Sequence, residues 1–98
     1  MSFEQAISTS LAAAVGDDRA LVAELETAFM ESASRHVETM RNAADDQDWR
    51  EAALRLKGLA ASFGATTLMQ HASKAADARR GDAEAMRDIE RGLMLITL

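Results

Sequence analysis

The chain contains no proline, and alanine occupies 21 of its 98 positions. Alanine is the strongest helix former because its side chain loses no rotamer freedom in a helix. Valine, isoleucine and threonine, the β-branched residues that favour strands, together supply only 12 residues. No segment alternates apolar and polar residues for long enough to form a half-buried strand. We therefore predict an all-α protein.

Residues that cap helices divide the chain into segments. Short polar side chains suit helix N-termini, and glycine suits the left-handed position that closes a helix. Combined with apolar residues at three- and four-residue spacing, they predict one short helix and four longer ones. The short helix is predicted at 2–15, opened by Ser2 with Gln5 and closed by Gly16, and the next is capped by Asp17 or Asp18 and has an apolar stripe from Leu21 to Ala43. The third is predicted at 49–63, opened by a capping box of Asp48 with Glu51 and closed by Gly64, and the fourth at 66–80, closed by Gly81. The last is capped by Asp82 and has Met86, Ile89, Leu93 and Ile96 on one face.

The joints between these helices are only a few residues long. Short joints make neighbouring helices pack antiparallel, and four apolar stripes together bury one core. We predict an antiparallel up-down four-helix bundle with a short additional N-terminal helix, formed by residues 1–98 as a single domain. A helical hairpin that completes its bundle by dimerising is the less favoured alternative, because four stripes already suffice.

Charge and composition exclude several classes of function. Eleven basic and 16 acidic residues give a net charge of −5, which argues against nucleic acid or anionic lipid as a partner. The absence of cysteine removes disulfides, thiol nucleophiles and cysteine-based zinc sites. Neither a signal-peptide pattern nor an apolar run of about 18 residues is visible. We expect a cytoplasmic protein with no membrane partner.

The two histidines, His36 and His71, do not form a recognisable metal site. Di-metal bundles place a glutamate three residues before an inward-facing histidine, whereas this chain has Ala33 and Leu68 there. Each histidine lies on or beside an apolar stripe, so we predict partly buried rings at the core boundary. No glycine-rich phosphate loop or nucleophile elbow occurs. We therefore predict no metal, no cofactor and no enzymatic activity.

Gly58 stands in the middle of a predicted helix, where it costs about 1 kcal/mol relative to alanine. Helical spacing places it on one face with Leu54, Lys57, Ala61 and either Arg50 or Glu51. The opposite face is predicted to be core and carries Ala53, Leu56, Ala60 and Phe63. Either another molecule approaches the backbone at Gly58, or a neighbouring helix packs on it within the bundle. Periodicity leaves both interpretations open.

The segment 48–65 resembles the core of histidine-containing phosphotransfer (HPt) domains. Their pattern is Ala-His-x-Leu-Lys-Gly, followed after about five residues by Gly-Ala. Here the corresponding residues are Ala53-Leu54-Arg55-Leu56-Lys57-Gly58 and then Gly64-Ala65. Further similarity lies at Gly16-Asp17, Phe29, Leu68 and Arg79-Arg80-Gly81-Asp82. The resemblance implies a four-helix bundle with an extra N-terminal helix, and exchange of a phosphoryl group between an exposed histidine and the aspartate of a receiver domain.

The sequence departs from this pattern at the phospho-acceptor, because Leu54 replaces the histidine. Leucine has no nucleophilic atom and cannot hold a phosphoryl group. Lys57 and Gly58 match the family residues that offset phosphate charge and leave room for the receiver. Neither His36 nor His71 is followed by the Leu-Lys-Gly sequence of the motif.

The resemblance therefore predicts a degenerate HPt module that binds a receiver domain or a histidine kinase without accepting phosphate. The predicted partner-binding residues are Arg50, Leu54, Lys57, Gly58 and Ala61, with Arg50 and Lys57 steering the protein electrostatically toward an acidic receiver pocket. Two alternatives stay open. One is a working phosphotransfer protein that uses His36 or His71. The other is a structural bundle that self-associates, as a weak homodimer, through Leu54 and its apolar C-terminus.

Overall fold

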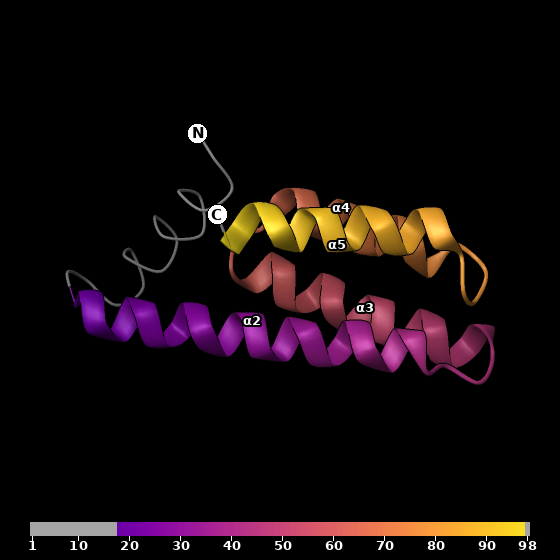
Figure 1. The fold of residues 1–98 in the computed structure, drawn as a ribbon, viewed down its shortest axis with the longest axis horizontal. Helices are drawn as coiled ribbons and strands as arrows, with labels where there is room; N and C mark the ends of the chain where they lie inside the picture. The colour runs from indigo at the N-terminus through magenta and orange to yellow at the C-terminus, as the bar shows by residue number, and fades with distance from the viewer. Residues whose placement is uncertain (1–17, 98) are drawn as a thin grey trace.

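The computed structural model describes residues 18–97, and this range contains four α-helices and no strand. The helices are α2 (Arg19–Arg41), α3 (Asp46–Ser62), α4 (Thr66–Ala76) and α5 (Ala83–Thr97). Successive helices run in opposite directions along the long axis of the molecule (Figure 1). The all-α prediction and the four long helices are confirmed. The predicted short helix 2–15 lies outside the described residues.

The helix N-termini are capped by aspartates, although one predicted cap is wrong. The carboxylates of Asp18 and Asp82 accept hydrogen bonds from the backbone N–H groups of Leu21 and Ala85, as predicted. Helix α3 begins three residues earlier than predicted, because Asp45 rather than Asp48 is its N-cap and accepts from the Asp48 N–H at 2.8 Å. Asp45 has the extended backbone of a cap, whereas Asp48 lies in the first turn, where a carboxylate favours the positive end of the helix dipole.

Helices α3 and α4 end in different ways. Gly64 follows α3 with a φ of 73°, in the left-handed region that glycine tolerates without strain. Helix α4 ends at Ala76, four residues before the predicted Arg80, so the predicted extent is wrong there. The chain leaves the helix because the Arg80 backbone N–H donates to Asp46 Oδ1 at 2.8 Å, at the start of α3. Gly81, with a φ of 80°, then turns the chain toward α5.

One hydrophobic core runs through the described part of the bundle. Its largest fully buried side chains are Phe29, Met40, Trp49, Leu56, Leu68 and Ile89. Buried alanines of α3 and α4 let these two helices pack closely, and the partly buried Phe63 stacks at a tilt on Phe29 with ring centroids 4.9 Å apart. The predicted stripe of α5 is confirmed, since Ile89 and Ile96 are buried and Met86 and Leu93 pack on the core.

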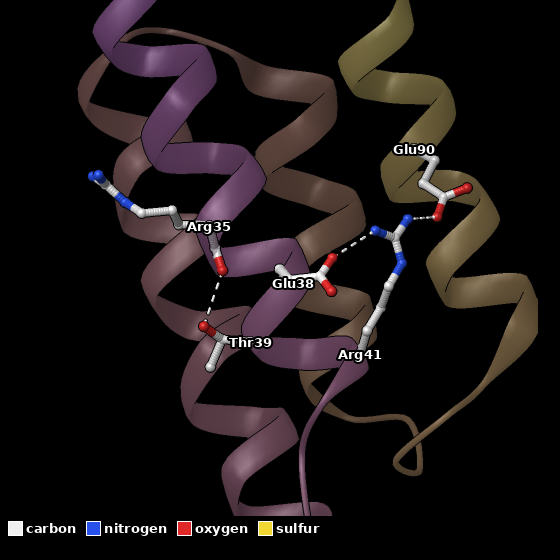
Figure 2. A network of polar contacts seen from close by, with 5 residues as sticks. All are labelled: Arg35, Glu38, Thr39, Arg41 and Glu90. Carbon is white, nitrogen blue, oxygen red and sulfur yellow. Dashed lines mark hydrogen bonds and ion pairs between the residues drawn. The ribbon is translucent and has the colours of Figure 1, made fainter.

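Polar contacts tie the helices together at the edges of this core. The indole Nε1–H of the buried Trp49 donates to the Ala75 carbonyl oxygen at 2.8 Å, which joins α3 to α4. Arg41 of α2 pairs with Glu38 on its own helix and with Glu90 of α5, as Figure 2 shows. The first contact joins α3 to α4, and the Arg41–Glu90 pair joins α2 to α5. None of the helices in the described range has the length and apolarity needed to cross a membrane.

Candidate functional site

Helix α3 has one buried face and one exposed face. Ala53, Leu56 and Ala60 are fully buried, which confirms them as core residues. The outward side carries Leu54, Gly58 and Ala61, which are exposed, and the half-buried Lys57. Leu54 is 39% exposed and is therefore one of few large apolar side chains that the described residues leave open to solvent. We call Leu54, Lys57, Gly58 and Ala61 the α3 face.

Gly58 lies at the centre of the α3 face and touches nothing there. A Cβ atom added at Gly58 would have no neighbour within 4 Å among the described residues. The backbone does not require glycine either, since positive φ angles occur only at Gly64 and Gly81 in this range. Its carbonyl oxygen makes a local contact, accepting a hydrogen bond from the Ser62 hydroxyl at 2.9 Å. Within the described residues, no neighbouring helix packs on Gly58.

Arg50, also predicted to bind a partner, is already engaged within the bundle. Its Nη1 donates to Asp77 Oδ1 at 3.0 Å and to the Ala76 carbonyl oxygen at 3.3 Å. Both acceptors lie at the C-terminal end of α4, so the guanidinium is turned toward α4 and its charge is offset by Asp77. The sequence placed Arg50 and Lys57 together as steering cations, but only Lys57 has no ion pair among the described residues.

A groove between α2 and α3 borders the α3 face on the other side. It is lined by Arg35, Glu38, Thr39, Asn42, Ala43, Asp48, Glu51, Ala52 and Arg55. Arg55 follows Leu54 directly, but helical spacing did not predict it as a site residue, because a step of one residue is a rotation of about 100° around a helix. That rotation turns Arg55 from the α3 face toward α2.

The two histidines are half-buried, as predicted, and neither belongs to the α3 face. His36 lies on α2, and its pKa is lowered from the usual 6.5 by burial first and then by the positive charges of Arg55 and Arg35. His71 lies on α4, where its ring packs near Gly92 of α5. Helix α3 itself contains no histidine. The structure therefore presents no imidazole beside Lys57 and Gly58.

The α3 face carries no imidazole, hydroxyl, thiol or carboxylate. Within residues 18–97, no cluster of three or more histidine and carboxylate side chains could hold a metal ion. The α3 face combines an apolar side chain, a backbone patch without a side chain, and an amine. Such an arrangement can bury Leu54 against another protein, and it contains no imidazole that could accept a phosphoryl group.

Comparison with known families identifies the bundle. The model of the Hpt domain family matches residues 24–96, which include most of α2 and all of α3 and α4. The chain therefore belongs to the Hpt domain family. No curated protein and no solved structure matches it. Membership implies a role in phosphorelay signalling, in which Hpt domains carry phosphoryl groups rather than act as enzymes in the usual sense. Hpt domains generally interact with receiver domains and histidine kinases.

Proposed function

We propose that this protein is a non-catalytic Hpt module that docks on a receiver domain, or on a histidine kinase, without accepting a phosphoryl group. The observation that carries this proposal is Leu54, which is exposed on α3 at the position that the family resemblance assigns to the phospho-acceptor histidine. Its side chain offers only carbon atoms to an incoming phosphoryl group, and phosphoryl transfer requires a nucleophile.

The α3 face supports docking for three physical reasons. Complete burial of a leucine contributes about 1.5–3 kcal/mol, and the exposed part of Leu54 is available for a share of that gain. The open space above Gly58 lets a partner approach the helix backbone. Lys57 places a positive charge beside the apolar anchor. A protein that binds in this way would sequester a response regulator, or would inhibit a kinase by competing for its receiver-binding surface.

Restoring the missing nucleophile tests the proposal most directly. Leu54→His places an imidazole beside Lys57 and Gly58, and we expect it to gain acid-labile phosphorylation from a phosphorylated receiver domain of the same organism. The matched control is Leu54→Gln, which is polar and of similar size but cannot accept the phosphoryl group. We expect wild type and Leu54→Gln to remain unlabelled.

The catalytic alternative has its own test. If the wild-type protein is labelled, and the label disappears in His36→Gln or His71→Gln, the protein is a working phosphotransfer protein and the proposal is wrong. Both rings are half-buried and both lie on helices other than α3, which favours the opposite result.

Docking itself is tested at Gly58. We expect Gly58→Gln to keep the helical fold and weaken receiver binding, because the new side chain fills the space that the partner would occupy. Ala23→Gln, at an exposed position on α2, is the control and should bind as wild type does. Unchanged binding in Gly58→Gln would place the docking surface elsewhere.

Self-association is a second candidate, favoured by the exposed apolar side chains at the end of α5. Met94 is 65% exposed and Leu95 is 46% exposed. Light scattering over a range of protein concentrations distinguishes a weak homodimer from a monomer. A dimer that dissociates in both Leu54→Gln and Leu95→Gln would support this candidate.

A further inference from the structure

The positive charges around the α3 face differ in how they are neutralised. Arg50 is paired with Asp77, at 3.0 Å. Arg35 and Arg55 line the groove between α2 and α3, and neither forms an ion pair within the described residues. This holds although three carboxylates, those of Glu38, Asp48 and Glu51, line the same groove.

Two of those carboxylates have other hydrogen-bond partners. Glu38 is bound to Arg41 at 3.1 Å, and Glu51 accepts a hydrogen bond from the Gln47 amide at 3.3 Å. Figure 2 shows that Arg35 extends from the side of α2 opposite to the network of Glu38, Arg41 and Glu90. Glu38 and Glu51 therefore have partners other than Arg35 and Arg55, which line the groove without an ion pair within the described residues.

The guanidinium groups of Arg35 and Arg55 both act on His36. Both lower the pKa of His36, after the larger effect of burial, so both contribute positive potential at the His36 ring on α2. Like charges held together in this way repel each other unless an anion lies between them. Guanidinium groups also match the planar geometry of carboxylates, with which they form paired hydrogen bonds.

We propose that Arg35 and Arg55 form an anion-binding edge of the α3 face, which receives carboxylate side chains of the docked protein. This inference rests on the proposed function, because it assigns the edge to the same partner that buries Leu54. The charges that attract the partner then lie on the α2 side of α3, and not on the α4 side, where Arg50 is paired with Asp77. The partner is therefore a protein whose surface has an apolar patch, which contacts Leu54, with acidic residues beside it, which contact Arg35 and Arg55.

A test without the natural partner uses a hexaglutamate peptide as the probe. Titration of the isotope-labelled full chain at low ionic strength should shift the NMR signals of the Arg35 and Arg55 Nε–H groups and of the His36 ring. The double variant Arg35→Gln/Arg55→Gln should abolish the response, and Arg50→Gln should retain it. Equal shifts in Arg50→Gln and the double variant, or no response in wild type, would overturn the inference. So would a stronger response to inorganic phosphate than to the peptide.

A second measurement uses a receiver domain that binds the wild-type protein. We expect Arg35→Gln/Arg55→Gln to lower the association rate by about 2- to 10-fold at an ionic strength of about 0.01 M, where the Debye length is about 30 Å. The effect should shrink in high salt, and Arg50→Gln should change the rate much less. An unchanged rate in the double variant overturns the inference.

The two hypotheses fail in different ways. If Leu54→Gln and Gly58→Gln bind the receiver as wild type does, the proposed function fails, whatever the peptide titration shows. If those variants lose binding while Arg35→Gln/Arg55→Gln keeps the wild-type association rate, docking at the α3 face stands and the anion-binding edge is wrong.

Discussion

Gly58 and Gly92 both stand inside helices, but their surroundings are opposite. Gly58 is exposed on α3, and an added Cβ would meet no described atom within 4 Å. Gly92 is buried on α5, where the added Cβ would lie 3.5 Å from Leu68 Cδ1 and 3.6 Å from His71 Cδ2. Each glycine costs its helix about 1 kcal/mol relative to alanine.

The two glycines differ in what their missing side chain allows. At Gly92 the missing side chain allows α5 to approach α4, so the contact with Leu68 and His71 offsets part of the cost. At Gly58 no contact in the described bundle offsets it, and the backbone does not need glycine's conformational freedom. A stability cost without compensation inside the fold favours a role outside it, which is the role that the docking proposal gives to Gly58.

The largest effect is expected from Gly92→Leu. The atoms beyond Cβ would overlap with Leu68 and His71, and overpacking of this kind costs about 1–3 kcal/mol. Urea denaturation followed by circular dichroism measures the loss. Gly92→Ala is the matched control, because a methyl group at 3.5 Å makes ordinary van der Waals contact, and its stability should equal or exceed that of wild type. A Gly92→Leu protein as stable as wild type would show that Gly92 is not needed for the close packing of α5 on α4.

A smaller effect of opposite sign is expected from Gly58→Ala. The methyl group enters open space and the helix gains propensity, so the free energy of unfolding should rise by up to about 1 kcal/mol. The same denaturation experiment measures it, and Gly64→Ala serves as contrast because its φ of 73° makes any side chain strained. Destabilisation by Gly58→Ala would show that the position is packed after all.

The smallest effect concerns His36 on α2, whose ring is affected by the charges of Arg55 and Arg35. Its pKa in the folded protein lies below the usual 6.5, so the unfolded chain binds the proton more readily. His36 therefore costs stability as the pH falls below about 6.5, and has no effect above it. We expect His36→Gln to reduce the acid-induced loss of stability, measured by urea denaturation at several pH values between 5 and 8. Equal pH profiles for variant and wild type would contradict the lowered pKa.

Much of the fold follows from local sequence signals. The aspartate caps at Asp18 and Asp82 and the glycine at Gly64 act within a few residues, so the sequence alone predicts them. The core of α3 is likewise predictable, because apolar spacing determines which face is buried. Asp45 was missed because several nearby aspartates compete for one cap, and the choice depends on where the buried Trp49 has to lie.

The parts that escaped prediction depend on contacts between distant residues. Helix α4 stops early because Arg80 binds Asp46, which lies 34 residues away in the chain. Arg50 shares a helix face with Leu54 and Gly58, but its engagement with Asp77 depends on how α4 ends. The importance of Arg55 and Arg35 appears only when α2 and α3 are placed side by side. Periodicity finds the faces of helices, and it does not show which charges meet across them.

Trp49 is the only tryptophan of a chain that also lacks tyrosine, so selectively excited fluorescence comes from one indole. That indole is buried between α3 and α4 and donates its N–H to Ala75, on the side of the helix opposite to Leu54. Its emission reports the integrity of the α3–α4 contact and is shielded from whatever covers the α3 face. A bound receiver that leaves the bundle intact should leave this emission unchanged, whereas one that shifts α3 would expose the indole and move the emission to longer wavelength.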